Sequence, residues 1–155
     1  MVEYRTNIGK TTDTAQDETL LGYNSTMYKH IHNPAKCYPS LANGILVTGG
    51  VGVWTLGSFV ELIPTNAITA SFDIHWINFE SASATDTYEL VLYGGLSGNE
   101  IEIGRIRTYR NSPVSGANNV PVQIPAQVPN TRISAKLASA TGGDNVTVSM
   151  FYHIY

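Results

Sequence analysis

The residues of this chain that could most readily bind a metal or react are two alternate histidines followed by a cysteine. His30 and His32 flank a single residue, and Cys37 lies five positions further on. A structural zinc site is usually built from four ligands at set spacings, and no second Cys or His cluster follows. Alternate histidines could still bind a metal on a symmetry axis, if each chain of a trimer supplied two. The simpler interpretation makes them surface or interface histidines and Cys37 a small apolar residue.

Carboxylates offer a second kind of chemistry, because two that converge could act as a glycosidase pair. They are scattered over outward positions of expected strands: Glu61, Asp73, Glu80, Glu89, Glu100 and Glu102. Such acids more commonly face basic residues across a sheet, here Arg105, Arg107 or Lys136. His75 and His153 also lie in expected strands, and we interpret them as ordinary polar positions. Without a nucleophile elbow or a phosphate loop, the sequence predicts neither an enzyme nor a cofactor.

Aromatic residues offer a third possibility, a carbohydrate-binding groove. The candidates are Trp54, Trp76, Tyr88, Tyr93 and Tyr152. Aromatic side chains on strands more often bury area in a core or a subunit contact, which is the interpretation that we favour.

Short strands must position all of these residues. From Pro39 onward, apolar and polar residues alternate between turns rich in Gly, Pro and Asn, a pattern typical of all-β folds. The expected strands are 44–48, 51–56, 58–63, 68–79, 87–93, 100–110, 120–125, 131–138 and 146–155. The prolines of 120–125 restrict it to an edge or an extended connection. Changes of parity predict bulges between Trp76 and Ile77 and at Gly104.

The spacing of these strands predicts an all-β fold, an antiparallel β-sandwich. A jelly roll of about eight strands is the leading version. An immunoglobulin-like sandwich is less favoured, because Cys37 has no partner for a disulfide. The last strand is apolar on one face up to the final residues, so it must be paired and covered.

Residues 1–40 differ from the β-sandwich domain expected over 41–155. They show no sustained period, apart from a possible helical turn over 14–21. Such a stretch is either disordered or an arm that lies on another surface. Its tyrosines, Tyr4, Tyr23, Tyr28 and Tyr38, are too many for a solvated tail, which favours an extended N-terminal arm. The residues expected to bind a partner are Tyr4, Ile8, Leu20, Leu21, Tyr23 and Tyr28.

The charge of the chain excludes several classes of partner. Its formal net charge is −3 and its pI about 5.7. The sequence therefore does not predict the basic surface that binds nucleic acid or an anionic membrane. No apolar run is long enough for a membrane helix, and the N-terminus lacks the features of a signal peptide. We therefore expect synthesis in a cytoplasm. Only 14% of residues are charged, as in proteins whose surfaces are buried in assemblies.

The amino-acid sequences of the expected strands resemble those of small structural proteins of tailed bacteriophages. The resemblance rests on GSFVELIP at 57–64, FDIH at 72–75, TYELVLY at 87–93, EIGRIR at 102–107, RISAKLAS at 132–139 and YHIY at 152–155. It covers about the C-terminal two thirds of the chain and contains no catalytic signature. Head decoration (cement) proteins, jelly-roll proteins that sit on the capsid as homotrimers, are the best analogy.

This resemblance implies a cement protein on the capsid surface of a virion. Its partners would be two further copies of the chain and the major capsid protein, whose neighbouring subunits it would clamp together. The alternative is a receptor-binding or fibre-tip module, in which loops such as 94–99 and 111–119 touch a cell-surface glycan.

Overall fold

The alternating segments form nine β-strands in the computed structural model, which describes residues 34–40, 43–111 and 118–155. The strands are β1 Lys36–Tyr38, β2 Ile45–Thr48, β3 Val60–Ile63, β4 Phe72–Ala82, β5 Asp86–Gly94, β6 Ile101–Arg110, β7 Asn118–Pro121, β8 Ile133–Ser139 and β9 Asn145–Ile154. The described residues contain no helix, in agreement with the pattern of the sequence.

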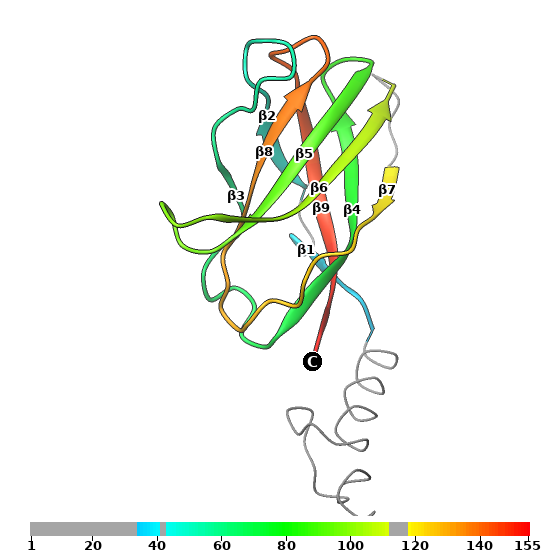
Figure 1. The fold of residues 1–155 in the computed structure, drawn as a ribbon. Helices are drawn as coiled ribbons and strands as arrows, with labels where there is room; N and C mark the ends of the chain where they lie inside the picture. Colours follow the sequence, from blue (N-terminus) through cyan, green and yellow to red (C-terminus); the bar gives the residue numbers. More distant parts are fainter. Residues whose placement is uncertain (1–33, 41–42, 112–117) are drawn as a thin grey trace, which may run out of the picture.

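These strands make two antiparallel sheets that pack face to face (Figure 1). Sheet A has the order β1–β9–β4–β7, with β2 paired to β9 next to β1, and sheet B has the order β3–β8–β5–β6. From β2 onward, successive strands alternate between the sheets except at the β5–β6 hairpin. The order 2–9–4–7 against 3–8–5–6 is that of a jelly roll, so the predicted fold class is confirmed. The ninth strand is β1, which adds to the edge of sheet A.

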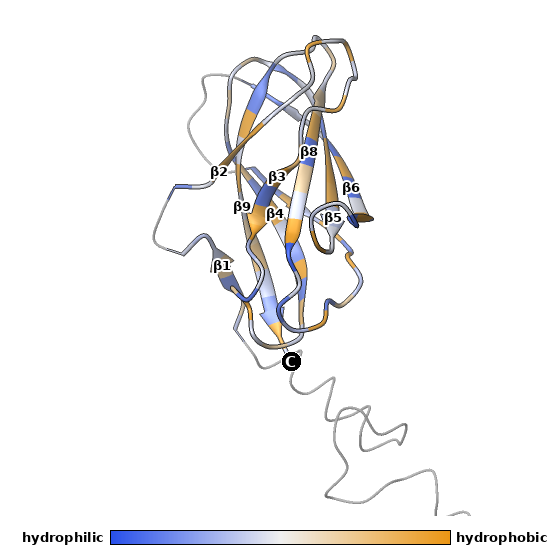
Figure 2. Ribbon diagram, turned by 90° about the vertical axis from the view of Figure 1, so that its left-hand side faces the viewer, coloured by the Kyte–Doolittle hydropathy of each residue, from blue (hydrophilic) through white to orange (hydrophobic). Residues whose placement is uncertain are grey.

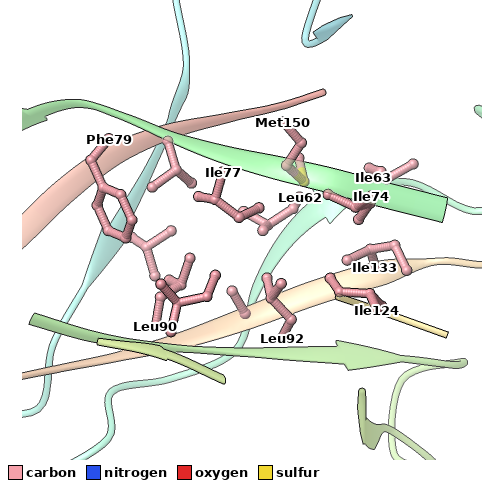
Figure 3. Close-up of a cluster of buried hydrophobic side chains, with 14 of the residues drawn as sticks. Leu62, Ile63, Ile74, Ile77, Phe79, Leu90, Leu92, Ile124, Ile133 and Met150 are labelled. Atoms are coloured by element: carbon pink, nitrogen blue, oxygen red, sulfur yellow. The ribbon is translucent and has the colours of Figure 1, made fainter. Parts of the chain in front are cut away.

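The core lies between the two sheets and follows from the two-residue period of the strands. Figure 3 shows side chains of β4 and β9, such as Ile77 and Met150, pointing toward Leu90 and Leu92 of β5. Of the eleven inward positions expected on β5, β8 and β9, Tyr152 and Ile154 are partly buried against the core, and nine are buried: Tyr88, Leu90, Leu92, Ile133, Ala135, Leu137, Val146, Val148 and Met150. Hydrophilic residues alternate with them along the strands (Figure 2), as expected for a sheet with one face on the core and the other in solvent.

A bulge in β4 decides which of its side chains face outward. Ile74 pairs with Tyr152 and Trp76 with Phe151, so His75 is an extra residue in the ladder. The sequence predicted this bulge between Trp76 and Ile77, with Trp76 on the same face as Phe72 and Ile74. That placement is wrong, because the bulge comes one residue earlier and leaves Trp76 on the outer face, 38% exposed. The bulge expected near Gly104 is confirmed, since Ile103 of β6 is unmatched in the pairing with β5.

The segment 51–56 is a loop and not the strand that its apolar residues predicted. Thr55 donates its amide to the carbonyl of Gly52 (3.0 Å), and Gly50 donates to that of Thr55 (2.9 Å), which closes a turn. Trp54 takes a positive φ of 52° that no strand allows. Val51 is 93% exposed. The apolar run was therefore misinterpreted, because these side chains pack on no core.

The strands at the edges and at the C-terminus agree with the prediction. β7, with Pro121, pairs only with β4, so it is an edge strand of sheet A. β9 lies between β4 and the pair β1 and β2, and is therefore paired on both sides. β1 belongs to the end of the expected arm and pairs with Met150–Tyr152 of β9. The possible helical turn over 14–21, the histidines His30 and His32 and the six expected partner-binding residues lie outside the described residues.

Candidate functional site

The outer face of sheet B is a charged surface held together by ion pairs. Glu89 accepts hydrogen bonds from Arg105 (2.6 Å) and Arg107 (2.5 Å), and Arg105 also contacts Glu102 at 3.0 Å. Burial raises the pKa of Glu89, but the hydrogen bonds from Arg107 and Arg105 outweigh it and keep the pKa below its ordinary value. The carboxylates here thus neutralise arginines, as the sequence predicted. Arg132 makes a second such group with Glu61 (2.6 Å) and Glu100 (3.0 Å).

Cations also cover aromatic rings on this side of the molecule. The Arg107 guanidinium lies 4.5 Å from the centre of the Trp54 ring, and the Lys136 ammonium lies 4.1 Å from that of Phe59. Phe59 further makes an edge-to-face contact with Tyr93 at 4.9 Å. These rings are engaged in cation–π and aromatic contacts within the chain.

The outer face of sheet A has a different character. The register places Cys37 of β1, Phe151 of β9, Trp76 of β4 and Pro121 of β7 side by side in one row. The neighbouring row consists of Ser149, Asn78 and Asn119. Neither row contains a charged residue. We call these two rows together the aromatic–amide face.

Two polar atoms on the aromatic–amide face have hydrogen-bonding capacity to spare. Asn78 Oδ1 and Ser149 Oγ are buried, and neither has a hydrogen-bond partner within the chain as described. Asn78 and Ser149 are direct cross-strand neighbours. A buried polar group without a partner is costly, and such groups are usually satisfied by an ordered water.

Beyond the Trp76–Phe151 row, the same face of sheet A carries a cluster of two histidines and an aspartate. Asp73 of β4 is directly opposite His153 of β9, and His75 is the bulged residue two positions after Asp73. Asp73 Oδ1 lies 3.0 Å from His75 Nε2. The two imidazole rings meet edge to face, with their centres 4.5 Å apart. One potential ligand atom from each of the three residues lies within 4.8 Å of the other two.

The C-terminal tyrosine completes this cluster. Tyr155 donates its hydroxyl to Asp73 Oδ2, so the two carboxylate oxygens of Asp73 have different neighbours. Burial and the hydrogen bond to the Asp73 carboxylate raise the pKa of Tyr155, and the phenol therefore stays protonated as a donor. The Asp73 side chain is 14% exposed and that of His75 26%.

A small hollow opens beside the cluster and gives it access to solvent. Its volume is about 280 Å³, and it is lined by Asp73, Ile74 and His75 of β4 together with residues 122–124. The segment 122–124 is held in place because Val122 donates its amide to the carbonyl of His75 (2.8 Å). The bulge and the chain that follows β7 together shape this hollow.

The structure separates the five aromatic residues considered for a carbohydrate groove. Tyr88 is fully buried in the core, and Tyr152 packs edge to face on the buried Phe72 at 6.1 Å. Trp54 and Tyr93 belong to the side of sheet B, whereas Trp76 lies on the outer face of sheet A. These five residues therefore form no common groove.

The His75–His153–Asp73 cluster was missed from the sequence, although its members were each placed on outward strand positions. Interpreting them one at a time gave three unrelated polar residues. Only the register between β4 and β9 brings His153 next to Asp73. The signal that could have been used is the short spacing Asp-x-His in one long strand, facing a histidine in another.

Comparisons with known proteins leave the family of this chain open. No family model and no curated protein matches it. Among solved structures, it is similar to Eiger TNF from S. frugiperda, with 11% sequence identity and a TM-score of 0.41, over 78% of this chain and 90% of that chain. This distant likeness carries no argument about function. Among the described residues, no helix is long and apolar enough to cross a membrane.

Proposed function

We propose that this chain is a structural virion protein, a cement protein that decorates the capsid surface of a tailed bacteriophage. It is made in the host cytoplasm, assembles as a homotrimer and binds the major capsid protein. It has no nucleic-acid or membrane partner and performs no catalysis. The strand sequences that resemble small phage structural proteins motivate this class of function. The contrast between an outer face without charge and an outer face covered by ion pairs supports it.

The observation that carries the proposal is the aromatic–amide face. Protein–protein contacts are depleted in charge and enriched in aromatic residues at their cores. The rows around Trp76 and Asn78 have this composition, whereas the outer face of sheet B is covered by arginine–glutamate pairs. We therefore assign the aromatic–amide face to the contacts between the three copies.

The position of β1 supports a role for the N-terminal arm. β1 pairs with β9 at the edge of sheet A, and its first residue, Lys36, lies opposite Tyr152, close to the C-terminus. An arm anchored by an edge strand can reach a neighbouring protein and bind it along an extended path. Each apolar side chain of the arm would contribute roughly 1.5–3 kcal/mol of binding free energy when it is buried against the major capsid protein. These residues are Tyr4, Ile8, Leu20, Leu21, Tyr23 and Tyr28.

Binding to heads and to host cells separates this function from a receptor-binding module. The protein should co-sediment with purified heads of the phage that encodes it, and it should not co-sediment with host cells. Three linked copies would give avidity without any strong single contact. The reverse result, binding to cells and none to heads, would contradict the cement function and favour a tip protein that recognises a glycan.

A further inference from the structure

We propose that Asp73, His75 and His153 form a zinc-binding site, with one Zn²⁺ ion held by each chain. The donors are one carboxylate oxygen and two imidazole nitrogens, contributed by the two central strands of sheet A. Zn²⁺ is bound in proteins by nitrogen and oxygen ligands of this kind, often with a fourth position left to water or another ligand. Two imidazoles favour zinc and its neighbours in the transition series over calcium or magnesium, which prefer oxygen alone.

The distances in the cluster fit such an ion after a small adjustment of side chains. Ligand atoms at about 2.0–2.1 Å from a tetrahedral zinc lie about 3.3 Å from one another. Asp73 Oδ1 and His75 Nε2 are already 3.0 Å apart. The third ligand atom, from His153, lies within 4.8 Å of the other two, so a rotation of its ring brings it into range. The backbone need not move, because Asp73 and His153 are paired residues of one antiparallel ladder.

Tyr155 acts as a positioning residue in this site. Its hydroxyl donates to Asp73 Oδ2, which leaves Oδ1 directed at His75. Hydrogen bonds of this kind orient carboxylate ligands and increase metal affinity. The hollow of about 280 Å³ beside Asp73 and His75 supplies the route by which an ion enters. The site is complete within one chain, so it depends neither on the trimer nor on the cement function.

Metal binding to the untagged, full-length protein tests the proposal. Titration with Zn²⁺ against a chromophoric chelator, after removal of bound metal, should show one ion per chain. The substitution His153→Ala should weaken the affinity by at least about 100-fold, because loss of a residue that only hydrogen-bonds to a metal ligand already costs about 10–100-fold. The matched control is the double variant His30→Ala, His32→Ala, which removes the other candidate histidines and should bind as the wild type does.

Spectroscopy on the wild-type protein keeps the test independent of whether a variant folds. The X-ray absorption spectrum of the zinc-loaded chain should fit two imidazoles with oxygen ligands and no sulfur. In the cobalt-substituted protein, Tyr155→Phe should shift the visible bands and lower the affinity about 10-fold, whereas a purely structural role would leave the bands in place. Absence of saturable binding to the wild type, a sulfur ligand, or loss of binding only in the His30/His32 variant would overturn the proposal.

Discussion

Asp73 on β4 and His153 on β9 face each other across the two central strands of sheet A, although they are far apart in the chain. The pleat of the antiparallel ladder directs both side chains to the outer face. The bulge at His75 then adds a second histidine on the same side. One cross-strand pair thus converts three scattered polar residues into a cluster.

Two adjacent glycines in the β8–β9 turn provide a test of the backbone. Gly142 and Gly143 both have positive φ, 83° and 76°, but only Gly142 has no room for a side chain, since a Cβ there would lie 2.5 Å from the carbonyl oxygen of Val51. Gly143→Ala should cost about 1–2 kcal/mol for its left-handed backbone. Gly142→Ala should cost about 1–3 kcal/mol more, through overpacking. Equal urea midpoints for the two variants would contradict this account of the turn.

Asp86 should contribute stability that depends on pH. Asp86 is 7% exposed, and its carboxylate accepts hydrogen bonds from the Thr141 amide (2.9 Å), the Thr141 hydroxyl (2.8 Å) and the Thr87 amide (2.7 Å). Burial raises the pKa of Asp86, but these hydrogen bonds together lower it below its ordinary value. The contribution is therefore fully present above the unfolded pKa of about 3.9 and is lost as the pH falls through the lower folded pKa.

The substitution Asp86→Asn tests this contribution, because it replaces an acceptor of three hydrogen bonds by an amide. We expect a loss of about 1–3 kcal/mol in the free energy of unfolding near neutral pH. The difference from the wild type should shrink as the pH is lowered through about 4 toward the folded pKa. Glu102→Gln, in an exposed ion pair with Arg105, should cost less. A difference that stays constant over this pH range would show that the charge of Asp86 is not involved.

The strands that the sequence predicted well are those with one solvent-exposed face and one face on the core. The alternation of β5, β8 and β9 placed Leu90, Leu137 and Met150 in the core without any knowledge of their partners. The loop around Val51 was misassigned because an apolar run resembles a strand even where nothing packs on it. The faces of β4 depended on the exact residue of a bulge, which the pairing with β9 determines.

The candidate site was less predictable than the fold, for a related physical reason. Periodicity gives the face on which a side chain lies, but not the register between two strands. His153 and Asp73 become neighbours only through that register. The aromatic–amide face likewise depends on the order of four strands, which brings Cys37, Phe151 and Trp76 into one row.

A charge on the aromatic–amide face should break the trimer. Trp76→Glu places a carboxylate in the row that we assign to the contact between copies, where an unpaired charge is strongly unfavourable. Ile101→Glu is the control, since Ile101 is 73% exposed on β6 at the edge of sheet B. Native mass measurement should give three chains for the wild type and the control, and single chains for the Trp76 variant. Trimers of the Trp76 variant would place the contact elsewhere.

Removal of residues 1–33 should separate folding from attachment. The alternation of apolar and polar residues begins beyond them, from Pro39 onward, so the shortened chain should keep the circular dichroism of a β protein. It should nevertheless lose most of its binding to phage heads, because it lacks the six apolar residues that we assign to the major capsid protein. If it sediments with heads as well as the full chain does, the sandwich itself carries the docking surface.

Electron cryo-microscopy of the intact phage particle tests the cement function most directly. A tag fused to the chain allows its density to be identified among the proteins of the virion. The cement function predicts density on the outside of the head, in groups of three sandwiches around local three-fold axes, with extended density over neighbouring subunits of the major capsid protein. Density confined to the tail or its fibres, or a particle that lacks the chain altogether, would contradict it.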